Sequence, residues 1–186
     1  SKPLFYDSMS LAATEAVKED VKKALKVFQK KWFGGKERLA VYKDTIKVQS
    51  HGKTPTYIDV TPEVKRVIEE SGIKSGLCAV ISPHTTCSVF FEEFVHDYNE
   101  NGDEFLQEDL NNALAKIIPD HVSADQYHYP GEEHYKEVET WPDLDFWLPG
   151  GDRTALFNGD AHLRSTILGS SEIFDVEDGK LGVGVT

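Results

Sequence analysis

The sequence predicts an α+β fold in which largely antiparallel sheets form a partly open barrel or sandwich with flanking helices. Three observations predict this class. Alternating β-branched segments occur without strict βαβ alternation, amphipathic helical segments lie between them, and a hairpin pattern closes the chain. A chain of 186 residues is of ordinary size for one hydrophobic core. We therefore expect one domain over residues 39–186, preceded by a helical extension over residues 1–38.

The extension carries an amphipathic helical pattern over residues 11–33, which Gly34 ends. Its apolar residues recur at spacings of three and four: Val17, Val21, Leu25, Phe28 and Trp32. The polar face mixes both signs of charge. This mixture favours packing against a core or a neighbouring subunit over lying on a membrane surface.

The first half of the domain predicts strands around one helix. Alternation and β-branching indicate strands over 39–50 and 56–60. Residues 61–63 (Thr-Pro-Glu) combine an N-cap residue, an early proline and a first-turn acid, so we expect a helix from there to residue 70. The apolar run over 76–91 predicts a long buried strand that is interrupted at Pro83.

The second half predicts two helices, a long loop and a hairpin. Apolar spacing indicates an amphipathic helix over 104–118 and a short helix over 160–168. Between them, residues 120–159 are rich in Pro, Gly, His and aromatics and show no period. A loop of that length in a compact domain is usually functional. Residues 173–185 predict the closing hairpin around a Glu-Asp-Gly-Lys turn.

Charge and composition exclude several classes of function. The net charge of −12 argues against binding to nucleic acid or to an anionic membrane, because both need clustered Lys and Arg. No stretch approaches the roughly 18 apolar residues of a membrane-spanning helix, and no signal-peptide pattern opens the chain. We expect a cytoplasmic protein in which Cys78 and Cys87 are buried thiols.

The first candidate site is the His84-Thr85-Thr86-Cys87 segment, where Pro83 breaks the apolar run. A neutral imidazole can bind a metal or move a proton, and threonine hydroxyls can hold phosphate oxygens. The alternative is a buried histidine that is hydrogen-bonded to backbone, without a function. An offset of three along a strand places His84 and Cys87 on opposite faces, so a Cys–His nucleophile is not expected.

A second candidate site is a cluster of histidines at residues 121, 128 and 134 beside Tyr127 and Tyr129. Their spacing matches no zinc motif, so they are equally well explained as histidines of a surface loop. The third candidate is the start of the helix over 160–168, where free N–H groups and Arg164 would form an anion site. Its alternative is a helix that Asn158 or Asp160 caps.

A fourth candidate matches the calcium-binding pattern D-x-[DN]-x-[DN]-G-x5-E over residues 97–108. Its side-chain ligands would be Asp97, Asn99, Asn101 and Glu108. Glu104 occupies a position that is usually apolar, and the segment lacks a clear entering helix and a second loop. The alternative is therefore a polar turn before an acidic helix start.

Two segments carry a resemblance to a known family: HTTCSVFFEE (residues 84–93) and NGDAHLRSTILG (residues 158–169). Together with TYIDVTPEVKRVIEESGIKSG (residues 56–76), they make the chain from residue 39 onward similar to the YjbQ-like proteins, which are known as secondary thiamine-phosphate synthases. The resemblance implies a homotrimer whose activity joins a pyrimidine pyrophosphate to a thiazole phosphate, with loss of pyrophosphate.

The resemblance also implies the roles of the site residues. The catalytic residues would be Glu93, Asp160, His162 and Arg164. A phosphorylated metabolite would be held by Thr85, Thr86 and Gly159. The ligands of a divalent cation, Mg²⁺ or Zn²⁺, would be His84, His128 and His162. Three features depart from the family. Glu92 adds a charge beside Glu93, the stretch 129–158 is longer, and the chain stops where the family continues with further strands.

Two other classes of function stay open. The three histidines would also suit a metal-dependent hydrolase of small phosphoesters or amides, with Glu93 activating water. Alternatively, a non-catalytic trimer would bind a metabolite, or Ca²⁺ through residues 97–108.

Overall fold

The computed structural model describes residue 23, residues 40–52 and residues 54–183. Within this part the fold is mixed α+β, as predicted, and its sheet is antiparallel and open. We describe the compact unit that residues 44–186 form. The helix expected over 11–33 and the extension over 1–38 lie outside the described residues, apart from Lys23.

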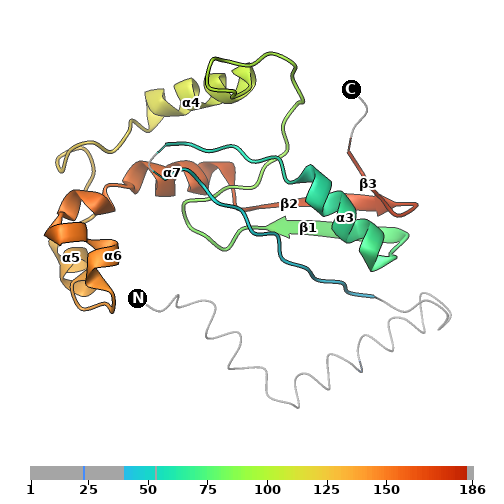
Figure 1. Cartoon of the computed structure of the whole chain (residues 1–186), viewed down its shortest axis with the longest axis horizontal. Coiled ribbons are helices and arrows are strands. Elements are labelled where there is room, and N and C mark those ends of the chain that lie inside the picture. The colour runs from blue at the N-terminus through green and yellow to red at the C-terminus, as the bar shows by residue number, and fades with distance from the viewer. Residues whose placement is uncertain (1–22, 24–39, 53, 184–186) are drawn as a thin grey trace. The chain divides into compact units, whose positions relative to one another are not determined.

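One three-stranded sheet forms the centre of this unit, in the order β1-β2-β3 (Figure 1). Strand β1 (Ser75–Ile81) pairs along its whole length with β2 (Ser171–Glu177), in a register that runs from Ser75 opposite Glu177 to Ile81 opposite Ser171. The predicted hairpin is present, and β3 (Lys180–Leu181) is its short return strand. Strands that are 90 residues apart in sequence thus make the main pairing.

Helix α3 (Thr61–Ser71) covers one face of the sheet, and the main hydrophobic core lies beneath it. Val64 and Ile68 on the helix pack against Val176 of β2, and all three side chains are buried. Pro62 opens the helix and Gly72, in the left-handed conformation at φ 67°, ends it. Half-buried side chains complete this core: Ile46, Val60, Cys78, Val80 and Leu181.

Two expected strands are absent from the described residues, and a third is shorter than expected. Residues 40–50 and 56–60 form no ladder, although Ile46 and Val60 still contribute to the core. The long strand expected over 76–91 ends at Ile81, and residues 82–91 continue without pairing as a strand. Alternation of apolar residues indicates an extended segment with one buried and one exposed side. A β-strand also requires a partner strand that hydrogen-bonds its backbone N–H and C=O groups.

Helix α4 (Phe105–Ile117) forms where its pattern predicts. The Glu104 N–H donates to the Gln107 side chain at its start, 3.2 Å away. From outside the helix, the Tyr57 hydroxyl donates to Asn111 Oδ1 at 2.8 Å. Burial is the main reason that the pKa of Tyr57 rises to about 12, so this hydroxyl stays a donor at any physiological pH.

The segment expected to be a loop, residues 120–159, instead contains four short helices: α5 (Glu132–Val138), α6 (Leu144–Trp147), η1 (Pro149–Gly151) and η2 (Arg153–Leu156). They pack around a second hydrophobic core, in which Val138 is completely buried against Tyr135, Leu148 and Leu156. We call residues 131–157 the short-helix module. Helices of three to seven residues are too short to show a helical period, which explains the error.

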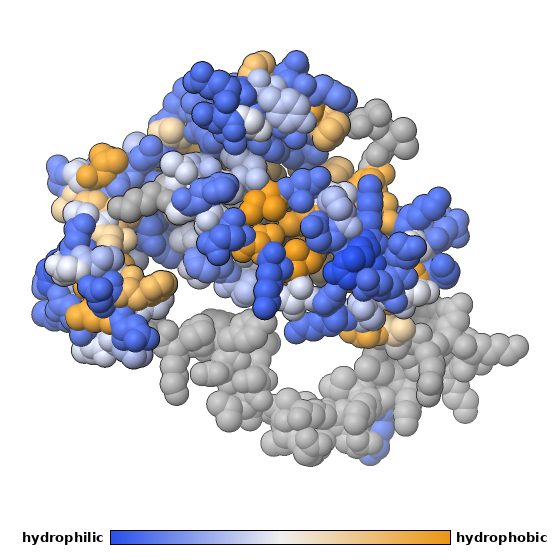
Figure 2. Space-filling model, in the orientation of Figure 1, coloured by the Kyte–Doolittle hydropathy of each residue, from blue (hydrophilic) through white to orange (hydrophobic). Residues whose placement is uncertain are grey.

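The other face of the sheet is bare within the described residues and carries both apolar and polar side chains. Its apolar residues are Leu77, Ala79 and Ile81 of β1 and Ile173 of β2, and Leu77 is 78% exposed. The register places Ser75, Ser171, Asp175 and Glu177 on this same face. Figure 2 shows hydrophobic atoms near the centre of the near side, which is the side of α3. A solvated face of an antiparallel sheet is normally polar, so the apolar residues are the part of the bare face that suits a covering partner.

Two smaller expectations also have an outcome. Cys78 is half-buried, but Cys87 is exposed because its segment leaves the sheet, so the prediction of two buried thiols is wrong for Cys87. In the described part of the chain, no helix has the length and apolar character needed to cross a membrane.

Candidate functional site

Helix α7 (Gly159–Leu168) carries four of the predicted site residues, Gly159, Asp160, His162 and Arg164. Its start is surrounded by side chains from the segment before the short-helix module and from α5. Gly159 is buried here because the backbone packs tightly: a Cβ at this position would lie 3.3 Å from His121 Nδ1 and 3.5 Å from a ring carbon of Tyr129. The position therefore favours glycine, because a larger residue would push the His121 ring away by a few tenths of an ångström.

His121 holds the start of α7. The Gly159 N–H donates to His121 Nδ1 at 3.2 Å, and the imidazole stacks on Phe157 with ring centres 4.4 Å apart. Only 6% of His121 is exposed. The sequence suggested that Asn158 or Asp160 would cap this helix, but neither side chain does, so that expectation is wrong. The cap comes from a histidine 38 residues earlier in the chain.

Tyr129 links α5 to the same site. Its hydroxyl lies 3.3 Å from His134 Nε2, and its ring meets the His162 ring edge-on with centres 5.6 Å apart. Burial raises the pKa of Tyr129, which keeps the hydroxyl protonated as a donor. Tyr129, His134 and His121 belong to the second candidate cluster of the sequence, but the family resemblance gave none of them a role. The local enrichment of histidine over residues 121–134 was the one signal for them.

Arg164 is anchored by groups near the end of α4. Its Nε and Nη2 donate to the Ile118 carbonyl, and Nη2 also pairs with Asp120 at 2.7 Å. Its side chain is only 13% exposed. The third nitrogen, Nη1, lies 3.8 Å from Asp160 Oδ2, which is beyond hydrogen-bond distance. The guanidinium is thus anchored at Nε and Nη2, while Nη1 makes the longer ion pair with Asp160.

The other predicted residues lie in separate segments. His84 and Cys87 close a turn after β1, in which the His84 carbonyl accepts from the Cys87 N–H and His84 Nδ1 lies 2.9 Å from Thr86 Oγ1. This segment is tied to α7 by Ser165, whose hydroxyl donates to the Cys87 carbonyl at 2.8 Å, and by the Val89 N–H, which donates to the carbonyl of Gly169 at the end of the helix at 3.2 Å. Four of the predicted site residues outside α7 are exposed: His84, Thr85, Glu93 and His128.

The predicted metal ligands do not assemble into a centre in one chain. Among the described residues, no three His, Cys, Asp or Glu side chains are close enough together to hold a metal ion. His84 follows β1, His128 precedes α5 and His162 is in α7. The divalent cation and the metal-dependent hydrolase stay predictions, and we derive no chemical step through a metal.

The calcium-like loop is closed by its own hydrogen bonds. Asn99 Oδ1 accepts from the N–H groups of Asn101 and Asp103, and its Nδ2 donates to Glu108 at 3.0 Å. This is the polar turn before α4 that the alternative described. Calcium binding through Asp97, Asn99, Asn101 and Glu108 stays a prediction.

Glu92, the extra acid beside Glu93, is partly withdrawn from water. Partial burial, and to a smaller extent the Glu104 carboxylate, raises its pKa, although a hydrogen bond with Gln107 opposes this. Because its pKa is raised, Glu92 becomes negatively charged only at a higher pH than an exposed glutamate does.

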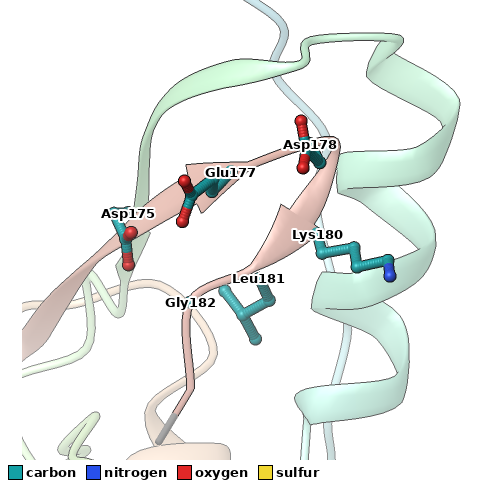
Figure 3. A pocket seen from close by; sticks show the side chains of 6 residues that line it. All are labelled: Asp175, Glu177, Asp178, Lys180, Leu181 and Gly182. Carbon is teal, nitrogen blue, oxygen red and sulfur yellow. The ribbon is translucent and has the colours of Figure 1, made fainter.

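Two clefts on the described surface lie away from α7. One, of about 260 Å³, follows the β2–β3 hairpin, where Figure 3 shows the carboxylates of Asp175 and Glu177 on one strand while Lys180 extends toward α3. The other, of about 530 Å³, lies in the short-helix module. Neither is lined by a predicted site residue.

The fold is that of a mixed α+β protein with an open antiparallel sheet. The model of the family described as UPF0047 protein YjbQ-like matches residues 44–186. The chain therefore belongs to the UPF0047 (YjbQ-like) family, as the resemblance in its sequence predicted.

Relatives occur in archaea and bacteria. A UPF0047 protein of Archaeoglobus fulgidus is 31% identical over 68% of this chain and 71% of its own length, and one of Methanocaldococcus jannaschii is 27% identical over 69% and 67%. A YjbQ/UPF0047 protein structure from Clostridium acetobutylicum is 28% identical, with a TM-score of 0.43 over 69% of this chain and 72% of that one.

We predict that His121→Ala lowers the free energy of unfolding by about 2–4 kcal/mol, because it leaves the Gly159 N–H buried without an acceptor and opens a cavity beside Phe157. Chemical denaturation measures this loss. His121→Asn restores an acceptor and should recover part of it.

The matched control is His128→Ala, which removes an exposed histidine from the same segment and should change stability by no more than about 0.5 kcal/mol. Equal losses in His121→Ala and His128→Ala would contradict the role of His121.

Proposed function

We propose that this chain is a transferase that joins a pyrimidine pyrophosphate to a thiazole phosphate, as in secondary thiamine-phosphate synthases. The observation that carries the proposal is the rigid arrangement of Asp160, His162 and Arg164 at the start of α7 in a member of the YjbQ-like family. The substrates are phosphorylated, and the α7 start offers the donors that phosphate oxygens require.

The reaction places its main electrostatic demand on the leaving group. As the thiazole nitrogen bonds to carbon, the carbon–oxygen bond to pyrophosphate breaks and the pyrophosphate carries away the electron pair. The N–H groups of Arg164 Nη1 would hold that anion, and so would the first-turn amides after Gly159, which have no acceptor within the helix. Hydrogen-bond donors that are already fixed in position stabilise the charge that develops in the transition state, because they do not have to reorganise.

His162 is the candidate for proton transfer in this site. It is half-buried, and its ring rests against Tyr129, which His134 contacts in turn. Protonated, it would neutralise the departing pyrophosphate; neutral, it would accept a proton from the substrate. Asp160, two residues before it, would orient an ammonium or amino group of the pyrimidine.

We also propose that the chain acts as a homotrimer, in which a neighbouring copy covers the bare face of the sheet. Leu77, Ile81 and Ile173 expose an apolar surface there, and the outer edge of β1 has no partner strand within the described residues. Assembly would also bring the exposed His84, Thr85 and Glu93 and the half-buried Thr86 near residues of another copy, as the family resemblance implies.

The activity is tested with the two phosphorylated substrates, with and without Mg²⁺, by measuring thiamine phosphate. His162→Ala should lower kcat at least about 100-fold, the usual contribution of a general acid or base, without changing the fold. The control His51→Ala removes an exposed histidine that has no place in the site.

Two results would contradict the proposal. Wild-type turnover by His162→Ala would remove His162 from the mechanism, and no product from the wild-type protein under either condition would reject the transferase activity.

Assembly is tested by light scattering on the purified chain. Ile81→Asp places a charge on the bare face and should reduce the mass from three chains to one. Val122→Asp, at an equally exposed position outside the sheet, should remain trimeric. A monomeric wild-type protein, or an Ile81→Asp variant of unchanged mass, would contradict the trimer.

A further inference from the structure

The short-helix module has a surface that the proposed transferase chemistry does not use. It has its own core, which consists of Tyr135, Val138, Leu148 and Leu156, and Figure 1 locates α5 and α6. Beside that core lies the cleft of about 530 Å³, which opens between the end of α5, α6 and η1. Residues that line it are Glu139, Leu144, Asp145, Leu148, Gly150 and Gly151. The cleft thus has two leucines and two glycines between two carboxylates.

The glycines keep this cleft open. Gly150 and Gly151 have φ values of 60° and 78°, and a Cβ at either position would meet no atom within 4 Å. The turn therefore needs glycine for its backbone conformation and leaves space in front of it.

Two aromatic side chains belong to the same short helix as the cleft residues Leu144 and Asp145. Phe146 and Trp147 follow Asp145 in α6, and Phe146 is 75% exposed. Their rings meet edge-on with centres 5.0 Å apart, and Trp147 meets Trp141 in the same way at 5.2 Å. Trp147 is thus fixed by a neighbour while part of its ring remains open. Exposed, oriented aromatic rings are the usual anchors of protein interfaces. We call the cleft together with Phe146 and Trp147 the α6 surface.

The charge around the α6 surface is mainly negative. Residues 131–157 contain seven carboxylates and two cations. Both cations are already engaged: Arg153 pairs with Glu132 and Glu139 at 2.8 Å, and Lys136 pairs with Glu133 at 2.7 Å. Asp143 and Asp145 have no cationic partner in the described part of the chain. An occupant of the α6 surface must therefore supply positive charge as well as apolar area.

We propose that the α6 surface binds a lysine-bearing amphipathic helix of a partner protein. Apolar residues of one helical face would fill the cleft and lie on Phe146 and Trp147. Lysines at the border of that face would pair with Asp143 and Asp145, with their aliphatic stems on the apolar floor. Charge complementarity selects this partner over an acidic or a purely apolar one. The inference does not depend on the transferase activity.

Fluorescence anisotropy tests this on the full chain with a labelled 18-residue helical peptide of leucine and lysine. The wild-type protein should bind it, and binding should weaken as salt is added. Phe146→Ala should weaken binding on the order of tenfold, as loss of an interface anchor does. Asp145→Asn keeps the acceptor for the Gly150 N–H, which donates to Asp145 at 3.0 Å, but loses the charge, so it should also weaken binding.

The matched controls are Phe94→Ala, an equally exposed phenylalanine outside the module, and the same peptide with glutamate in place of lysine. Phe94→Ala should bind as the wild type does, and the glutamate peptide should not bind. The proposal is overturned if both peptides bind alike, or if Phe146→Ala binds normally. It is also overturned if Phe146→Ala changes the number of chains in the assembly, because the surface then belongs to a second copy.

Discussion

The hydrogen bond from the Gly159 N–H to His121 Nδ1 is the contact on which the candidate site depends. It fixes where α7 begins, and α7 carries Asp160, His162 and Arg164 in sequence from that point. The bond joins segments that are far apart in the chain, in a tight space where a Cβ on residue 159 would lie 3.3 Å from His121 Nδ1. A buried N–H group without an acceptor costs about 1–3 kcal/mol, so the imidazole is a structural requirement of this helix start.

Around this contact, two kinds of interaction complete the site. Arg164 is held at Nε and Nη2 by backbone and carboxylate oxygens near the end of α4, which leaves Nη1, in its longer ion pair with Asp160, for the proposed ligand. Tyr129 connects His162 with His134 and so joins α7 to the short-helix module. The module therefore has two roles in our account. One side supports the proposed phosphate site, and the α6 surface is available to a partner.

The elements that the sequence predicted correctly are those that a local pattern of residues specifies. The helices over 61–71 and 105–117 were predicted from their start signals and apolar spacing, and the final hairpin from its turn residues. Strands over 40–50 and 56–60 were predicted wrongly, because alternation describes side-chain faces and cannot identify a pairing partner. The end of β1 at Ile81 follows from the break near Pro83 and the turn that His84 and Cys87 close.

The candidate site was predicted only in part, for the same reason. Asp160, His162 and Arg164 lie within one helix, so one motif indicated all three. His121 and Tyr129 reach that helix from a segment without helical period, and no local pattern relates position 121 to position 159. Residues 84–93 carry the other half of the family resemblance, but they meet α7 in its second half and at its end, through the Ser165–Cys87 and Val89–Gly169 hydrogen bonds, and not at its start.

The most direct test of this account is the protonation state of the His121 ring, measured by nitrogen-15 NMR of the imidazole at neutral pH. Because Nδ1 accepts from Gly159, the account predicts a neutral ring with its proton on Nε2 and a bare Nδ1. A proton on Nδ1, in either the neutral or the charged ring, would contradict it, since the start of α7 would then have lost its acceptor.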